Sequence, residues 1–318
     1  MLNKTMKELK FLEIINKTLS KNSLLGEDCA YLKDFNLFIT QDTLCEGIHF
    51  DLRYTDFYSL AKKAVAVNIS DLAANLAEPK YISISFSAPK DINEKDIKMF
   101  YKGIEESCNL YNIEVCGGDI TGSTENIIIS ICALGKPIKN APKVSRGFAK
   151  EGQVVCLTKN YGSSAYGLYC LKSSQKCSKE ITKSHLLPEP DLEISKTLAM
   201  LKCKKIAVMD SSDGLCDALF KIAKYSHVSI EVDFKKIPYT KEIENYSGNF
   251  KDLILWGGED YGLIFCISEK EFEFISNILP QIKKIGVVKP YNENYYVKND
   301  NLKIDEKTFI KKNFNHFE

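Results

Sequence analysis

The stretch AKKAVAVNISDLAANLAEP at residues 61–79, followed by YISISFSA at residues 81–88, decides the class of the fold. The first part is rich in alanine and leucine and has a helical pattern, so we expect a helix over residues 58–77. The second part alternates apolar and polar residues, which is typical of a strand. The chain therefore mixes helices with strands, and we predict an α/β (α+β) protein.

The same mixture continues on both sides of this stretch. In the first half we expect a strand around LFIT within residues 36–50, a helix at 93–111, and strands at 113–116 and 127–135. In the second half we expect strands at 154–158, 205–209, 228–234, 253–256 and 263–267, with helices at 162–171 and after residue 214.

A domain boundary is predicted between these halves. Residues 136–152 contain two prolines and two glycines, which break regular structure. The chain has 318 residues, more than a usual domain of about 100–200 residues. We therefore predict two domains, residues 1–140 and residues 141–318.

The composition excludes several classes of protein. Hydrophobic residues make up 44% and charged residues 27%, as in globular proteins, and the net charge is +1 without a basic cluster, so we expect no nucleic-acid partner. No apolar run reaches the ~18 residues of a membrane span, and the first residues suggest an amphipathic helix rather than a signal peptide. The 11 cysteines show no C-x-x-C spacing, which favours a reduced, cytoplasmic protein without a zinc framework.

Acidic residues recur after the predicted strands or in the helices that follow them. They are Asp28 in GEDCA, Asp42 in TQD, Asp71 in NISD, Asp119 in GGD, Asp210 and Asp213 in MDSSDG, and Glu259 with Asp260 in GGED. Any single one of them is more simply explained as a turn residue or a helix N-cap. As a set at the carboxyl ends of strands they would repel one another unless divalent cations bound between them. Mg²⁺ is the expected ion, because it takes oxygen ligands and bridges carboxylates to substrate phosphates.

The common nucleotide motifs are absent. The sequence contains neither G-x-x-x-x-G-K-[ST] nor a G-x-G-x-x-G after a strand, and the protein-kinase motifs are missing. Phosphates must then be held by metal ions, backbone N–H groups and a few cations. Lys63 and Arg146 are the candidate cations, although each reads equally well as a surface charge.

The motifs together resemble the thiamine-monophosphate kinase family of the aminoimidazole-ribotide-synthetase-like superfamily. GEDCA resembles the family's G-D-D-x-A, TQDTLCEGIHF its T-T-D-x-L-V-E-G-x-H-F, and AKKAVAVNISDLAANLAEP its K-A-L-A-V-N-L-S-D-L-A-A-M-G-A-E-P. GGDITGS, MDSSDGLCDAL, GGEDYG and the closing Phe314-Asn315-His316-Phe317 resemble further family motifs in the same order. The resemblance spans nearly the whole chain, and the NISDLAA and GGED blocks are its most specific parts.

The resemblance implies roles for individual residues. Metal ligands would be Asp28, Thr40, Asp42, Asp71, Asp119, Asp210 and Asp213, of which Asp71, Asp119 and Asp213 are the expected catalytic residues; Gly118, Arg146 and Ser212 would contact ATP; and His49, Glu259 and Phe314 would contact the acceptor. A terminal aromatic residue such as Phe314 reads equally as a core residue.

The chain also departs from the family pattern. Glu27 replaces a usual Asp, Gln41 a usual Thr, Ser211 a usual apolar residue and Gly262 a usual Glu. Leu76 stands where the family often has Gly. Gly262 is next to the expected acceptor residues, so this departure bears on the choice of acceptor.

The implied activity is a phosphoryl transfer. ATP is the expected co-substrate, several Mg²⁺ ions the cofactors, and thiamine monophosphate the acceptor, whose phosphate is largely an anionic nucleophile at neutral pH. The implied fold is the two-domain synthetase-like fold, with a homodimer formed through the N-terminal sheet. Alternatives are another ATP-using member of the superfamily, such as an aminoimidazole ribonucleotide synthetase or a selenophosphate synthetase, or a non-catalytic nucleotide-binding protein.

Overall fold

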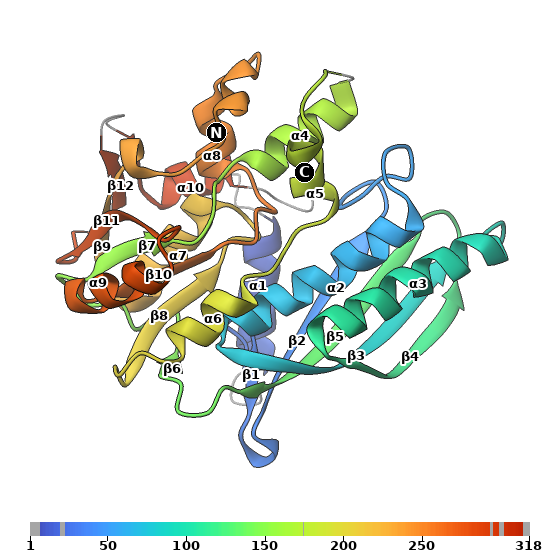
Figure 1. Ribbon diagram of the computed structural model, residues 1–318, viewed down its shortest axis with the longest axis horizontal. Helices are drawn as coiled ribbons and strands as arrows, with labels where there is room; N and C mark the ends of the chain where they lie inside the picture. Colours follow the sequence, from blue (N-terminus) through green and yellow to red (C-terminus); the bar gives the residue numbers. More distant parts are fainter. Residues whose placement is uncertain (1–6, 20–22, 174, 293–294, 299–301, 314–318) are drawn as a thin grey trace.

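A computed structural model describes residues 7–19, 23–173, 175–292, 295–298 and 302–313, and two β-sheets with flanking helices make up its architecture (Figure 1). The first sheet has the strand order β1-β2-β5-β3-β4. Its strands are β1 (Ala30–Leu32), β2 (Leu37–Cys45), β3 (Ala77–Ala88), β4 (Glu114–Gly122) and β5 (Ile128–Pro137). Strands β3 and β4 are parallel and the other pairs are antiparallel. β4 is the last strand in the order and therefore lies at an edge of the sheet.

Two helices, α2 (Phe57–Ala74) and α3 (Glu94–Tyr111), cover one face of this sheet (Figure 1). Helix α2 begins at Asp56, whose side chain accepts a hydrogen bond from the Ser59 N–H. Its alanines and branched residues are buried almost all round, because it packs on the sheet and on α3 and also contacts the second half of the chain. The helix ends before Leu76, which has a left-handed backbone with φ of 50°.

The second sheet has the strand order β13-β12-β9-β11-β7-β10-β8-β6. Its strands are β6 (Lys143–Val144), β7 (Val154–Leu157), β8 (Lys205–Asp210), β9 (Ser229–Asp233), β10 (Leu263–Ile267), β11 (Lys283–Lys289), β12 (Tyr295–Lys298) and β13 (Leu302–Ile304). The chain passes from the first sheet to the second between Pro137 and Lys143. The division at residues 140 and 141 lies in this connection and stays a prediction.

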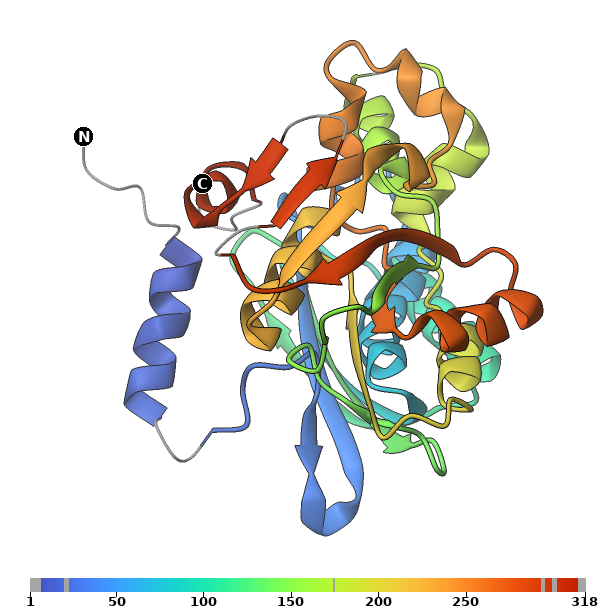
Figure 2. The same ribbon diagram turned by 90° about the vertical axis from the view of Figure 1, so that its left-hand side faces the viewer.

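The remaining helices surround the second sheet, with one exception. They are α4 (Ser163–Ser173), α5 (Lys179–Leu186), α6 (Leu192–Leu198), α7 (Leu215–Ser226), α8 (Phe250–Trp256), α9 (Glu269–Ile278) and α10 (Glu306–Lys312), with short 3₁₀ turns at Lys33–Phe35, Phe234–Lys236 and Lys241–Asn245. The exception is α1 (Lys7–Leu19), the predicted amphipathic helix, which stands apart from the body in Figure 2. In the part of the chain described here, no helix is both long and apolar enough to cross a membrane.

A hydrophobic core joins the two halves. One buried cluster lies within the first sheet and its helices, and another lies within the second half. A third cluster combines Ala74 and Leu76 from the end of α2 with strand residues such as Val154 and Phe265 from the second sheet. The end of α2 is thereby fixed against the second sheet, and this junction is where the acidic motifs meet.

Most of the predicted elements are confirmed, but the strand at residues 253–256 is wrong. These residues belong to α8, which Asn249 begins by accepting a hydrogen bond from the Lys251 N–H. A run of four apolar residues does not distinguish a strand from one turn of a buried helix. The elements after residue 267 were not predicted.

Candidate functional site

Three carboxylates from different parts of the chain meet at the junction of the two halves. Asp28 precedes β1, Asp71 lies in the last turn of α2, and Asp210 ends β8. Each of them offers an oxygen within 4.8 Å of the others. The Thr40 hydroxyl on β2 donates to Asp71 Oδ2 at 2.5 Å, and the Ser70 hydroxyl donates to Asp210 Oδ2 at 2.8 Å.

Asp42 and Asp213 extend this acidic cluster toward solvent. Asp42 is two residues after Thr40 on β2 and so shares the strand face that Thr40 presents to α2, and its N–H donates to the Asn68 side chain on that helix. Asp213 follows β8 in the turn before α7. Burial, the Asp213 charge and the Asp28 charge together raise the pKa of Asp42 to about 6. The five predicted ligands Asp28, Asp42, Asp71, Asp210 and Asp213 therefore act on one another electrostatically.

The cluster resists holding all of its negative charges at once. Burial and the neighbouring carboxylates raise the pKa of Asp71 well above its ordinary value. Burial, then the charge of Asp28, raises the pKa of Asp210 to about 7. Like charges that are buried together favour the protonated form unless a cation neutralises them. A set of hard oxygen ligands with this charge fits divalent cations such as Mg²⁺.

Two cations flank the cluster. Arg146 is 8% exposed, and its guanidinium donates to Asp28 Oδ1 at 2.5 Å, while its backbone N–H donates to Glu27 Oε2 at 3.0 Å. Lys221 on α7 lies 3.3 Å from Asp213 and 2.7 Å from the buried Asp217. Arg146 was predicted to contact nucleotide, whereas Lys221 was not predicted at all.

A pocket of about 610 Å³ opens beside the cluster. Asp42 and Asp213 form its wall toward the cluster. The other lining residues include the predicted His49, Ser212 and Glu259, together with apolar and aromatic side chains such as Leu168, Trp256 and Tyr261. A few polar groups in a largely apolar wall are typical of a small-molecule site.

Glu259 is held from two sides by residues that the sequence analysis did not assign to it. Lys63 Nζ on α2 lies 2.7 Å from Glu259 Oε1, and His185 Nδ1 on α5 lies 3.2 Å from Glu259 Oε2. Burial alone would raise the pKa of Glu259, but the charge of Lys63, and then that of His185 when it is protonated, keep it below its ordinary value. Lys63 was considered as a phosphate-binding cation, and its partner here is Glu259.

Asp119, a predicted metal ligand, and Gly118, a predicted ATP contact, do not lie with the other predicted site residues. Asp119 lies on the edge strand β4 and pairs with Ser85 of β3. Asp42 lies on β2, and the strands β5 and β3 separate β2 from β4. Three strand spacings of about 4.8 Å separate the two strands by about 14 Å. Ser85 is exposed between the buried Ile84 and Phe86, so Asp119 shares the sheet face that α2 does not cover. Phe314, the third predicted acceptor residue, lies outside the described residues.

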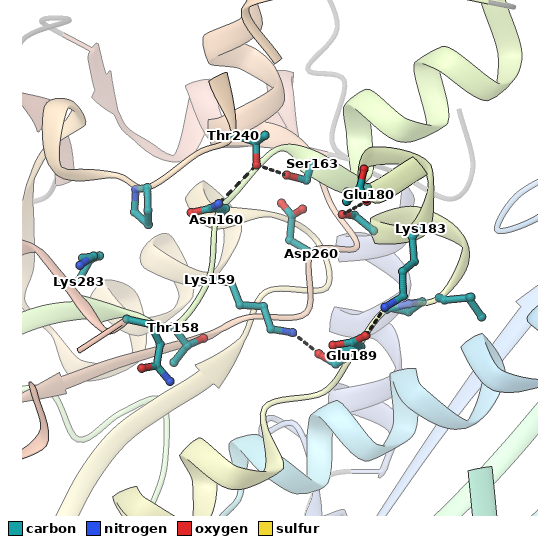
Figure 3. A pocket seen from close by; sticks show the side chains of 15 residues that line it. Thr158, Lys159, Asn160, Ser163, Glu180, Lys183, Glu189, Thr240, Asp260 and Lys283 are labelled. Atoms are coloured by element: carbon teal, nitrogen blue, oxygen red, sulfur yellow. Dashed lines mark hydrogen bonds and ion pairs between the residues drawn. The ribbon is translucent and has the colours of Figure 1, made fainter. Parts of the chain in front are cut away.

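A second pocket, of about 560 Å³, lies behind the GGED loop (Figure 3). Figure 3 shows Lys183 directed at Glu189 and Lys159 directed at the Glu189 backbone, and Lys283 donates to the Pro280 carbonyl. The cations of this pocket are thus engaged with the protein itself. Of the acidic motif residues only Asp260 lines it, and none of the residues with an assigned role does, so we place the functional site at the acidic cluster.

His185 and Trp256 are the site residues that were hardest to predict from the sequence. His185 is 2% exposed, and Trp256 is the single tryptophan of the chain, directly before the GGED motif. The scarcity of both residue types in the chain was a weak signal. Only the fold brings α5 next to the GGED loop.

Comparison with known proteins agrees with this geometry. A model of the N-terminal domain of AIR synthase related proteins matches residues 26–136. The thiamine-monophosphate kinase of Bacillus subtilis is 33% identical over 309 residues, which cover 92% of this chain and 93% of that protein. The thiamine-monophosphate kinase of Escherichia coli is 32% identical and covers 77% of this chain and 76% of its own length.

Solved structures agree as well. The structure of AaThiL complexed with AMPPCP and TMP has a TM-score of 0.84 at 30% identity and covers 96% of this chain and 98% of its own. The hydrogenase maturation protein HypE of E. coli, at 15% identity and a TM-score of 0.72, shares the fold alone. The order of the motifs, the two sheets and the level of identity all lead to the same assignment: the chain belongs to the thiamine-monophosphate kinase family.

Proposed function

We propose that this chain transfers the γ-phosphoryl group of ATP to thiamine monophosphate and forms thiamine diphosphate by direct in-line attack. The observation that carries the proposal is the junction of the acidic cluster with the 610 Å³ pocket, where Asp42 and Asp213 belong to both. A phosphate held at the cluster and a ring held in the pocket would meet at these two residues. AaThiL, with 30% identity, was solved with AMPPCP and TMP together.

The donor set fits magnesium. Asp28, Asp71 and Asp210 bring oxygens within 4.8 Å of one another, and Asp42 and Asp213 lie beside them. Bound there, Mg²⁺ supplies neutralisation of the phosphate charges that the buried carboxylates would otherwise repel. Thr40 orients Asp71 and Ser70 orients Asp210 through their hydroxyl groups. We assign Asp71 and Asp213 catalytic roles on this basis.

The chain's own residues position the reactants rather than exchange protons with them. The acceptor phosphate has a second pKa of about 6, so it is largely a dianion at neutral pH and needs little help from a base. His49 and Glu259 line the pocket in which the acceptor ring would lie, and Ser212 lies at the wall shared with the cluster. Catalysis then follows from alignment and charge neutralisation, as in other phosphoryl transfers.

We further propose a homodimer that forms through β4. Every residue of this edge strand is exposed, including Val115 at 48% and Ile120 at 69%. An exposed apolar edge is an unpaired template for another strand. In such a dimer Asp119 and Gly118 would lie at the interface between the two copies, and we propose that they contribute to catalysis from there. We also propose a reducing, cytoplasmic location, which the free cysteines support.

A coupled assay of ATP consumption tests the activity. ADP should form in the presence of thiamine monophosphate and Mg²⁺, stop on addition of EDTA, and resume with excess Mg²⁺. Consumption of ATP with the substrate of an aminoimidazole ribonucleotide synthetase or a selenophosphate synthetase, and none with thiamine monophosphate, would favour the other superfamily activities. Nucleotide binding without turnover on any acceptor would favour a non-catalytic protein.

Unphosphorylated thiamine is the informative control. Its hydroxyl is a weak nucleophile unless a base removes the proton, which contributes roughly 10²–10⁴-fold, and none of the described pocket residues is assigned that role. Thiamine also lacks the phosphate that would be held at the cluster. A kcat/KM for thiamine comparable to that for thiamine monophosphate would mean that one of the carboxylates acts as a base.

A further inference from the structure

Glu259 lies on a loop whose conformation is determined from several directions. Its backbone has φ of +65°, and Tyr261 two residues later has φ of +50°, a left-handed conformation that costs a residue with a side chain about 1–2 kcal/mol. The Glu259 N–H donates to the Ser212 carbonyl at 2.7 Å. The next residue, Asp260, accepts the N–H groups of Gly162 and Ser164. Such strain persists only where the surroundings enforce it, and it is typical of functional sites.

The side-chain carboxylate of Glu259 is also held in place. Each of its oxygens has its own partner, Lys63 Nζ at 2.7 Å and His185 Nδ1 at 3.2 Å. Lys63 is 3% exposed and also donates to the His49 carbonyl at 3.2 Å, and His185 is 2% exposed. His185 Nδ1 also lies 3.1 Å from the Ser164 hydroxyl, and its contact with Glu259 is favourable when Nδ1 carries the proton, because an ionised carboxylate only accepts hydrogen bonds. A neutral imidazole supplies this donor, because burial and then the charge of Lys63 lower the pKa of His185 to about 4.

We propose that Lys63 and His185 are positioning residues that hold the Glu259 carboxylate in a single orientation toward the acceptor ring. The inference rests on the proposed function and adds the residues that give Glu259 its geometry. A carboxylate has about four lone-pair sites, so two remain for the acceptor when two are taken by the clamp. Lys63 belongs to the first half of the chain, and Glu259 and His185 belong to the second. The acceptor pocket is therefore complete only when the two halves are docked.

Steady-state kinetics on Lys63→Met provide the first test, with Lys62→Met as the matched control. Lys62 is the preceding residue of α2, but its ammonium contacts Tyr58 and Glu106 away from the pocket. Lys63→Met should raise the KM for thiamine monophosphate about tenfold, the loss expected for one charge-assisted hydrogen bond, and leave the KM for ATP within about twofold. Lys62→Met should change neither constant. An equal rise of both constants in Lys63→Met would overturn the inference.

A comparison of two further variants distinguishes a positioning role of Lys63 from a purely stabilising one. The comparison can be made even if Lys63→Met does not fold. Glu259→Gln leaves Lys63 buried without a counter-charge, whereas the double variant Lys63→Met/Glu259→Gln removes both charges and should have the higher Tm. If Lys63 acts through Glu259, these two variants have the same KM for thiamine monophosphate, within about twofold. A further rise in the double variant would show that Lys63 acts independently and would overturn the inference.

His185 gives an independent test by conservative rescue. His185→Ala removes the donor and should raise the same KM, whereas the amide of His185→Asn can donate to Glu259 and should restore most of it. Equal losses in both variants would overturn the role of His185. A wild-type protein that does not phosphorylate thiamine monophosphate would instead refute the proposed function itself, and this is measured before any variant.

Discussion

At the scale of single residues, Leu76 shows how the chain departs from its family without changing the fold. The sequence comparison places Leu where the family often has Gly, and the backbone there is left-handed with φ of 50°. Leu76 follows the last turn of α2, the position where helices most often end in glycine. Its side chain is 1% exposed in the core that joins the two halves. Burial of the leucine side chain thus offsets the strain of its backbone.

At residue 76 a glycine variant should be more stable than an alanine variant, which is the reverse of the usual order in helices. Leu76→Ala removes the buried side chain and keeps the strain, and should destabilise by about 2–4 kcal/mol. Leu76→Gly loses the same contacts but relaxes the backbone, so it should be about 1 kcal/mol more stable than Leu76→Ala. Urea unfolding of the three proteins measures this difference. If Leu76→Gly were less stable than Leu76→Ala, as is usual in a helix interior, the left-handed backbone would carry no strain.

Asp210 should make the metal-free protein less stable as the pH rises. Its pKa is raised to about 7 by burial and by Asp28, while an unfolded Asp titrates at 3.8. Between these values the folded state binds more protons than the unfolded state, so stability falls as the pH rises through this window. Asp210→Asn removes this penalty. It should stabilise the protein in EDTA at pH 8 by up to about 4 kcal/mol, which is about three pKa units at about 1.4 kcal/mol each, and by less at pH 5.

Asp210→Asn should also lose activity, because Asp210 is a proposed ligand of Mg²⁺. Thermal unfolding in EDTA at pH 5 and pH 8 gives the stability, and the coupled assay gives the turnover. Asp71→Asn is a useful comparison, since the pKa of Asp71 is also raised by burial and by its neighbours. A gain in stability that is the same at both pH values would contradict the electrostatic explanation.

The departures at Ser211 and Gly262 contact each other through the backbone of Gly262. The Ser211 hydroxyl donates to the Gly262 carbonyl at 3.0 Å and accepts the Gly262 N–H at 3.1 Å. A Cβ added at Gly262 would lie 3.0 Å from the Tyr161 hydroxyl and 3.4 Å from Thr158 and Lys159. Thr158 and Lys159 line the second pocket rather than the acceptor pocket. A side chain at residue 262 would therefore point away from the acceptor.

At the scale of elements, β4 is the strand that the fold leaves unfinished. It pairs with β3 on one side, and its other edge is free within the described part of the chain. Long exposed edges with apolar side chains are usually covered or paired in stable proteins. This edge is the element on which the proposed dimer depends.

Ile120→Lys on β4 should convert the dimer to monomers. A charge at an exposed edge opposes strand pairing between copies, while a surface substitution changes the stability of one chain by only about 0.5 kcal/mol. Light scattering should show a mass near 36.0 kDa instead of twice that value. Met200→Lys, at a residue that is 64% exposed in the other half, is the control and should leave the mass unchanged. A wild-type monomer at micromolar concentration would exclude the proposed dimer.

At the scale of the whole molecule, the sequence predicted what local patterns and short motifs encode. The helix α3 and the strands β3 and β5 followed from periodicity, because each has a buried face and a more exposed one. The helix α2 is buried almost all round and was recognised by its length and its richness in alanine and leucine. The acidic motifs indicated a cluster, and five of the six aspartates act on one another in the structure. The helix α8 was mistaken for a strand, because its apolar run is too short to show a period.

Pairings over long distances could not be predicted. Lys63 and Glu259 are 196 residues apart (259 − 63), and neither motif names the other as its partner. His185 reaches Glu259 only because α5 packs near α2. Asp119 looked equivalent to the other aspartates in sequence, but the order of strands puts it at the far edge of the sheet. These facts depend on topology, which a pattern of residues along one chain does not determine.

The position of Asp119 also predicts how two defective genes would behave in one cell. Asp71→Asn and Asp119→Asn should each be inactive alone. If Asp119 serves the site of the other copy, a mixed dimer of the two variants contains one site with both carboxylates intact and one with neither. Random pairing of equal amounts makes half of the dimers mixed, so about a quarter of the wild-type activity should return. Two null alleles would then complement each other, and no return of activity on refolding the variants together would mean that each chain works alone.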